Sequence, residues 1–378
     1  MMVDGYGNIY APLLPLLIPR LGLSLAAAGT LTMLFQIAAS VAQVGFGRLA
    51  DRWKPRVLVM IGPIIAVSLL SLIGLAQTPA MLAVILVTGG LGAAAFHPPA
   101  AALAHRLGGE RPGFAMSVYI TGGTLGFSLG PLMFAPFAGR FGIEWTPLLA
   151  IPGLIVVAFF LMRVPQFPIP HASRGHLSDL RPYAKPLGLL YSIVVLRTLA
   201  SLSFATFMPV MLTRRGTSVG AAGGAVAIYL FATSLGGFVG GSLADRYGAR
   251  RMIIGSLVAA VPFLAIAPAF TGWPFVVIVA LGGLLLQSTL PVNVTFGQSI
   301  APISAATVSS LMMGFGWGTA GISVPFVGML ADRIGIEHAL MVMAFMPLLA
   351  AALAIPLPAG TRSPAVAHAA EVAGAEPE

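Results

Sequence analysis

Apolar stretches of about 20 residues recur along the whole chain, and each is long enough to cross a membrane as a helix. Helices satisfy their own backbone hydrogen bonds in lipid, so the stretches predict an all-α membrane protein. Only 8% of the 378 residues are charged, against about 25% in soluble domains. We expect twelve transmembrane helices, near residues 1–20, 24–48, 56–77, 80–107, 111–138, 145–163, 184–212, 218–243, 251–270, 273–300, 303–330 and 337–356.

The pattern Gly-x-Leu-Ala-Asp-Arg occurs at residues 47–52 and again at 241–246, 194 residues later. The same spacing relates Ser24 to Ser218, and a spacing of 193 relates the Gly-Ile-Glu sequences at Gly142 and Gly335. Six spans therefore repeat in parallel, which is typical of transporters built from two pseudo-symmetric six-helix halves. We expect an N-terminal half at 1–163, a cytoplasmic linker at 164–183, a C-terminal half at 184–356 and a disordered tail at 357–378.

The positive charge follows the loops. The chain carries 20 Lys and Arg and a formal net charge of +9. Most of these residues lie in the loops after the second, fourth, sixth and eighth spans, so the positive-inside rule predicts that both termini are cytoplasmic. We expect a monomeric, multi-pass protein of the inner (plasma) membrane, surrounded by lipid, and we expect no nucleic-acid partner.

The first span is short. At the 194-residue spacing, Asp4 aligns with Thr198, which lies midway along the seventh span. The first span thus lacks its first turns, and about ten further residues upstream would complete it at about 1.5 Å per residue. On this alignment Asp4 lies near the middle of the membrane. The alternative is that Asp4 is cytoplasmic.

Three ionisable residues fall inside the predicted spans: Asp4, His97 and Arg197. A charge in the membrane costs a few kcal/mol or more, so such residues usually face a cavity or a partner. We expect Asp4 and His97 to couple transport to protons, because a carboxyl can exchange a proton and histidine ordinarily titrates near neutral pH. We expect Arg197 to bind solute. Two structural roles remain open: His97 could cap a bend at Pro98, and Arg197 could simply pair with Asp4.

Polar residues inside the spans are candidates for lining a solute cavity, although many such groups only join helices together. Asn293, close after Pro291 in the tenth span, is the strongest of them. Together with Arg197, the expected solute-binding residues are Asn8, Gln36, Tyr119, Gln287 and Asn293.

The sequence argues against an enzyme. It contains no cluster of His, Asp and Glu that could hold a metal or act as acid and base. It also lacks a phosphate-binding glycine loop followed by Lys and Ser or Thr. We therefore expect no metal and no cofactor, and a small-molecule substrate moved by an ion gradient or passively.

The two Gly-x-Leu-Ala-Asp-Arg loops resemble the signature loops of the major facilitator superfamily, although the first copy has Lys54 and no glycine at its turn. This resemblance implies that Asp51 binds the start of the eleventh span near Ser304 and that Asp245 binds the start of the fifth near Gly113. Both contacts would hold the cytoplasmic side shut. Alternatively, the arginines only anchor the loops. The expected gating residues are Gly47, Asp51, Arg52, Gly241, Asp245 and Arg246.

The fifth span carries Gly122, Gly126, Gly130 and Pro131, a series that resembles the antiporter motif of exporters in this superfamily. Small residues four apart allow close helix packing. The His97-Pro98 pair, with Ala-Met-Ser at 115–117, is similar to the fosmidomycin resistance branch of drug exporters. The resemblance implies proton-coupled efflux of a small drug-like or organic solute. Proton-coupled uptake of a small organic anion or metabolite is the alternative.

Overall fold

The computed structural model describes residues 1–52, 55–164, 177–301 and 305–358, and within these ranges it contains helices and connecting turns but no strand. Eleven segments in these ranges are long and apolar enough to cross a membrane. The all-α, multi-span prediction is therefore confirmed, with eleven full-length spans and a shorter first segment, the one that the sequence predicted to be short.

The N-terminal half begins with two short helices. The segment expected as the first span divides at Asn8, whose side-chain Nδ2 donates to the backbone oxygen of Asp4 at 2.9 Å. The helices of this half are α1 (Met2–Gly7), α2 (Tyr10–Leu21), α3 (Leu25–Gln36), the π-helix η1 (Ile37–Val41), α4 (Ala42–Arg52), α5 (Pro55–Ser71), the 3-10 helix η2 (Leu72–Leu75), α6 (Pro79–Leu107), α7 (Pro112–Phe141), the 3-10 helix η3 (Ile143–Leu149) and α8 (Ala150–Arg163).

The C-terminal half repeats this order with longer elements. Its tenth span divides near Ser288, between α12 and α13. The helices are the 3-10 helix η4 (Leu177–Tyr183), α9 (Ala184–Arg214), α10 (Val219–Tyr247), α11 (Ala249–Ile266), the 3-10 helix η5 (Ala267–Ala269), α12 (Gly272–Gln287), α13 (Thr289–Ile300), α14 (Ala305–Ser309), the π-helix η7 (Ser310–Phe315), α15 (Gly316–Ile334), α16 (Ile336–Ala344) and α17 (Met346–Ala354).

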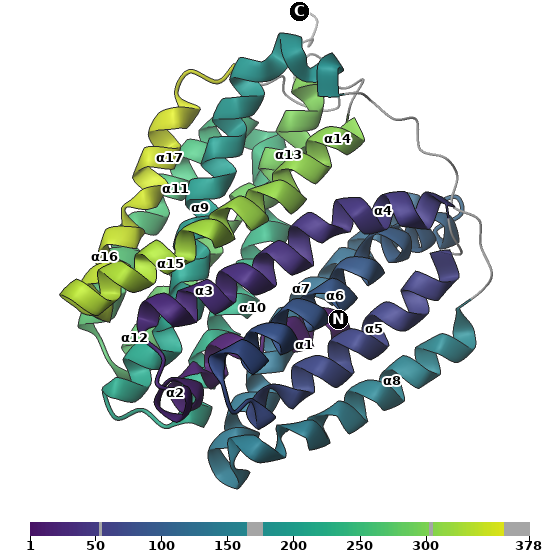
Figure 1. Cartoon of the computed structure of the whole chain (residues 1–378). Coiled ribbons are helices and arrows are strands. Elements are labelled where there is room, and N and C mark those ends of the chain that lie inside the picture. The colour runs from purple at the N-terminus through teal and green to yellow at the C-terminus, as the bar shows by residue number, and fades with distance from the viewer. Residues whose placement is uncertain (53–54, 165–176, 302–304, 359–378) are drawn as a thin grey trace, which may run out of the picture.

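The bundle has two ends, which Figure 1 shows at the upper right and the lower left. We call the end where α4, α8 and α10 finish and α9 begins the linker end. The other end, where α2 joins α3, α9 joins α10 and α15 joins α16, is the far end. The repeated serines start equivalent helices at the far end: Ser24 Oγ accepts from Ala27 N at 3.1 Å, and Ser218 Oγ accepts from Ala221 N at 3.3 Å.

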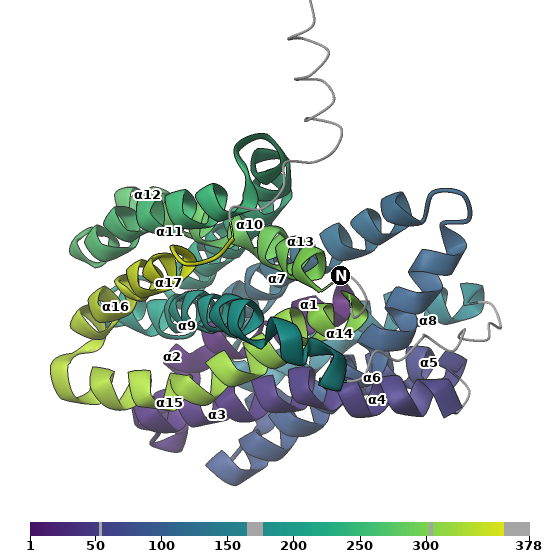
Figure 2. The ribbon, with the colours of Figure 1, turned by 90° about the horizontal axis from the view of Figure 1, so that it is seen from above.

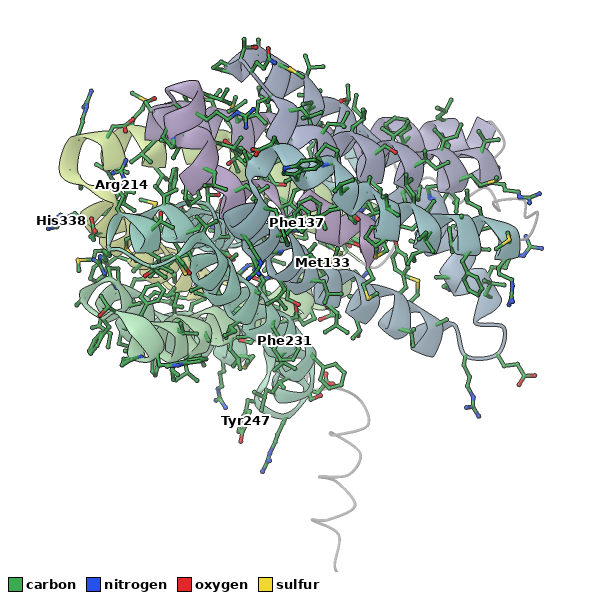
Figure 3. The ribbon with its side chains drawn as sticks, turned by 90° about the horizontal axis from the view of Figure 1, so that it is seen from below. Met133, Phe137, Arg214, Phe231, Tyr247 and His338 are labelled. Atoms are coloured by element: carbon green, nitrogen blue, oxygen red, sulfur yellow. The ribbon has the colours of Figure 1, made fainter. Side chains whose placement is uncertain are left out.

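The two halves pack mainly through two helix pairs, α3 with α15 and α7 with α10, and Figure 2 shows each pair side by side. The short α2 adds contacts to α9 and α10. Glycines permit the close approach. A Cβ at Gly29 would lie 2.8 Å from the carbonyl oxygen of Val324 in α15, and one at Gly220 would lie 3.2 Å from the Cα of Pro136 in α7. The remaining helix faces carry exposed apolar side chains, such as Phe231 of α10 in Figure 3, as expected where lipid covers the protein.

Candidate functional site

Asp4 and His97 lie against each other within the N-terminal half. The distance from His97 Nε2 to Asp4 Oδ1 is 3.5 Å, and both side chains are largely enclosed, with 25% and 11% of their surface exposed. The terminal amine of Met1 lies 3.3 Å from Asp4 Oδ2. The two residues expected to handle protons therefore form one pair in the interior of the bundle, between α1 and α6.

Tyr119 of α7 extends this pair. Its hydroxyl lies 3.2 Å from His97 Nδ1 and donates to the backbone oxygen of His97 at 3.3 Å. The imidazole is thus held at Nδ1 while its Nε2 faces the carboxylate. Tyr119, expected to bind solute, belongs to the Asp4–His97 pair in this structure.

The glycines of α7 explain how α1 reaches this position. A Cβ at Gly126 would overlap the carbonyl of Met1, and one at Gly130 would overlap the carbonyl of Gly5. One turn before Gly126, a Cβ at Gly123 would lie 3.5 Å from Asp4 Oδ2. The close packing of α1 on α7 therefore delivers the Asp4 carboxylate to Gly123.

The other two residues of the expected packing motif behave differently. A Cβ at Gly122 would have no neighbouring heavy atom within 4 Å, so no other helix among the described residues packs closely against this glycine. Pro131 lies at the contact with the other half, because its carbonyl oxygen is 3.2 Å from the Cβ position of Gly223 in α10. The motif thus divides between packing α1 and packing α10.

The C-terminal half holds a fully buried cation. Arg197 of α9 is 0% exposed. Its Nη1 donates to the Oε1 of Gln287 at the end of α12, and its Nη2 donates to Thr198 Oγ1 at 3.0 Å. Its Nε has no partner, and among the described residues no Asp or Glu pairs with it. Asp4 lies against His97 instead, so the structure does not contain the alternative Arg197–Asp4 pair.

Asn293 of α13 is also fully buried, and neither polar atom of its side chain has a hydrogen-bond partner among the described residues. Leaving such groups unpaired costs about 1–3 kcal/mol each, so a bound solute that forms hydrogen bonds with Asn293 would remove this cost. Two other expected solute ligands have structural contacts. Asn8 bonds to the backbone of α1, and Gln36 packs at the α3–α15 contact, 2.7 Å from the Cβ position of Gly321.

Asp245 is expected to gate the linker end near Gly113, whose surroundings lie outside what the structure describes. The Asp245 side chain is exposed and makes no hydrogen bond or ion pair with the described residues, and Gly241 has open space at its Cβ position. The Cζ atom of Arg246 lies 5.4 Å from the centre of the Tyr247 ring. A Cβ at Gly47 would lie 3.9 Å from Pro98 Cβ. Asp51 and Arg52 end α4, but their side chains, like Ser304, lie outside what the structure describes.

Sequence reasoning missed a third copy of the loop pattern, Gly-x-Leu-Ala-Asp-Arg at residues 328–333. It ends α15 at the far end of the bundle. Asp332 Oδ1 accepts from the backbone N of Leu25 at 3.0 Å, and Oδ2 accepts from that of Ala26 at 2.9 Å. The signal was present in the letters of the sequence, but this copy does not lie at the half-repeat spacing.

Within the described residues no group of His, Cys, Asp and Glu could hold a metal ion. The site is therefore built from a titratable pair in one half and a fixed buried cation in the other. Such an arrangement can bind protons and an anionic or polar solute.

Comparisons with known proteins agree with this architecture. The chain is 28% identical over 368 residues to the fosmidomycin resistance protein of Escherichia coli strain K12, covering 92% of this chain and 88% of that protein. It is 29% identical over 375 residues to an uncharacterized MFS-type transporter, YfnC, of Bacillus subtilis strain 168, with 92% and 88% covered.

Among solved structures, the chain resembles a bacterial homologue of the human lysosomal transporter Spinster in an inward-facing, unoccupied conformation. The TM-score is 0.73 at 17% identity, over 93% of each chain. The family model of the Major Facilitator Superfamily matches residues 1–202 and 190–376. These relatives are transporters, and the resemblance expected from the loop motifs is confirmed: the chain belongs to the Major Facilitator Superfamily.

Proposed function

We propose that this transporter exports a small drug-like or organic solute in exchange for protons. The observation that carries the proposal is the contact of His97 with Asp4 at 3.5 Å. The C-terminal half of the same protein holds polar atoms of Arg197 and Asn293 that have no partner among the described residues. Similarity to the fosmidomycin resistance protein supports efflux.

The linker end faces the cytoplasm in this proposal, because the basic loops gather there. The far end is closed by the α3–α15 and α7–α10 contacts, while Asp245 at the linker end is exposed and has no partner among the described residues. On this proposal, the closed far end and the exposed Asp245 support a state that opens inward. The chain has no cysteine, so a Gln77→Cys variant carries a single thiol, at the far end. This thiol should react with an impermeant maleimide added outside intact cells. A lack of reaction would contradict the proposed orientation in the membrane.

The exchange follows from charge. Solute binds from the cytoplasm to the Arg197, Gln287 and Asn293 groups while the Asp4–His97 pair releases a proton inward. After the halves rock, a proton from outside binds the pair and solute leaves. One proton moves inward for each conformational return, and the inward proton gradient of the membrane makes exchange into export.

Proteoliposomes with an acidic lumen test the sign of coupling, with fosmidomycin as the probe. Antiport predicts that fosmidomycin accumulates in the lumen as protons leave, and that a protonophore abolishes the accumulation. If the acidic lumen instead drives preloaded fosmidomycin out, the protein is a symporter and the proposal fails.

One observation favours the alternative, proton-coupled uptake of a small organic anion. Arg197 is fully buried with no carboxylate partner among the described residues, and an unpaired buried cation is costly unless an anion joins it. The same vesicles separate the two functions, since symport and antiport move solute in opposite directions under one proton gradient.

A further inference from the structure

We infer that Asp332 is a latch that holds the far end of the transport path closed, and that it must release α3 for this end to open. The inference concerns the conformational cycle and is independent of which solute or ion is moved. It assigns a role to the third Gly-x-Leu-Ala-Asp-Arg copy, which the proposed function leaves unused.

The latch is a carboxylate on a helix N-terminus in the other half. Asp332 accepts from the first two N–H groups of α3, those of Leu25 and Ala26, at 3.0 and 2.9 Å, while Ser24 Oγ accepts from the third, that of Ala27. These N–H groups have no partner within their own helix. Hydrogen bonds to an ionised acceptor and the positive end of the helix dipole both favour this contact.

The Asp332 carboxylate is stabilised by the partner helix α3 and not by its own helix α15. It lies in the last turn of α15, where the negative end of that helix's own dipole disfavours a carboxylate. When the far end opens, Asp332 keeps this unfavourable position and loses the two N–H groups of α3. The contact therefore stabilises the closed far end relative to the open one.

Backbone packing seats the latch. A Cβ at Gly328, one turn before Asp332, would overlap the carbonyl of Leu25, and one at Gly318 would lie 2.9 Å from Val41. At Gly314, nearer the linker end, the closest atom is the carbonyl oxygen of Ser40 at 3.9 Å. The contact is thus tightest at the far end and loosens toward the π-helices η1 and η7, where the two spans can bend.

The symmetric helix pair lacks the carboxylate. At the 193-residue spacing Asp332 corresponds to Gly139 of α7, which faces the start of α10. A Cβ at Gly139 would lie 3.6 Å from the backbone N of Gly220 and 3.5 Å from Val219 Cβ, both ordinary contacts. Gly139→Asp therefore has room to place a second carboxylate on the first turn of α10, and this offers a gain-of-function test.

Spin labels on the cysteine-free chain measure the closed and open populations. Gln77→Cys with Arg214→Cys reports the far end from one exposed residue in each half, and Figure 3 shows Arg214 projecting from the surface. Glu110→Cys with Tyr247→Cys, also exposed, reports the linker end. Electron paramagnetic resonance in nanodiscs gives both distance distributions.

We expect Asp332→Asn to raise the ratio of far-end-open to far-end-closed molecules about tenfold, equivalent to about 1.4 kcal/mol. The linker-end pair should close as the far-end pair opens, which mere fraying of α15 would not produce. In the otherwise native chain, Gly139→Asp should lower the ratio of far-end-open to far-end-closed molecules. Combined with Asp332→Asn, it should reverse part of the increase in this ratio. Arg333→Gln, a neighbouring exposed change, should leave both distributions unchanged.

Unchanged far-end distances in Asp332→Asn would overturn the latch, as would a far-end increase with no closure at the linker end. If Asp332→Asn fails to fold, Gly139→Asp in the otherwise native chain carries the test. A second carboxylate that leaves the open ratio unchanged would then contradict the inference.

Discussion

The two halves share one helical plan but carry different chemistry at matching positions. Asp4 of the N-terminal half aligns with Thr198, while Arg197 aligns with the apolar Val3. At the 193-residue spacing that relates Pro98 to Pro291, His97 corresponds to Leu290. One half therefore holds a pair that can gain and lose a proton, and the other holds a cation of fixed charge. The repeat preserves the scaffold, and under the proposed function divergence at a few positions divides proton handling from solute binding.

The strongest way to break this comparison is Asp4→Asn. It removes the acidic member of the Asp4–His97 pair. Under the proposed function, the ratio of fosmidomycin inside to outside should therefore fall at least about tenfold, which corresponds to about 1.4 kcal/mol or more of lost driving force. Protein levels in the membrane should be unchanged, and Asp4→Glu should retain part of the activity. Undiminished pH-dependent flux in Asp4→Asn would remove the carboxylate from the coupling mechanism.

Arg197→Met tests the fixed charge of the other half. Hydrogen bonds to a charged group contribute about 1.5–3 kcal/mol, so solute affinity should weaken about tenfold to a hundredfold. The change leaves Gln287 and Thr198 without their bonds to Arg197, at about 1–3 kcal/mol each. It also removes the cost of a buried cation that has no carboxylate partner among the described residues, so the temperature of thermal unfolding should change little. An exposed control, Arg214→Met, should change neither quantity. A variant that unfolds at a lower temperature yet binds normally would make Arg197 structural.

His97→Gln sharpens the difference between the halves with a smaller effect. The variant removes the imidazole that faces the Asp4 carboxylate, so transport initial rates should depend less steeply on pH and fall severalfold at the optimum. The corresponding change in the other half, Leu290→Gln, should leave the pH profile of transport intact. Identical profiles for wild type and His97→Gln would assign the histidine only to the helix bend.

Tyr119→Phe should have the smallest effect. It removes one hydroxyl that holds the imidazole, and a hydrogen bond of this kind contributes about 0.5–1.5 kcal/mol. Coupled transport should fall about threefold, with solute affinity unchanged, because Tyr119 contacts His97 and no residue of the Arg197 group. Tyr10→Phe, which loses a bond to the carbonyl of Ala28, is the matched control and should not alter coupling.

Much of the scaffold could be predicted because helix length, apolarity and the half-repeat are properties of the sequence itself. The repeat also aligned Asp4 with the middle of a span, and the structure brings it to His97. Which glycines pack could not be predicted, since periodicity does not say which neighbour faces which side of α7. Gly126 and Gly130 meet α1, but Gly122 meets nothing within 4 Å.

The roles of individual polar residues were hardest to infer. Tyr119 and Asn8 were expected to bind solute, but a polar residue in a span gives no sign of whether its partner is solute or another helix. The structure joins the first to His97 and the second to the backbone of α1. Asp332 was missed because its copy of the motif lies off the half-repeat spacing, whereas the role we infer for it depends on which helix it faces across the two halves.

The central claim is that solute and protons move in opposite directions. Its most direct test is a pH-sensitive dye sealed in the lumen of proteoliposomes at equal pH on both sides, with fosmidomycin added outside and its entry measured in parallel. Antiport through the Asp4–His97 pair predicts that the lumen becomes more alkaline as fosmidomycin enters, and that Asp4→Asn abolishes the alkalinisation. A lumen that becomes more acidic, or that keeps its pH while fosmidomycin enters, would contradict the account.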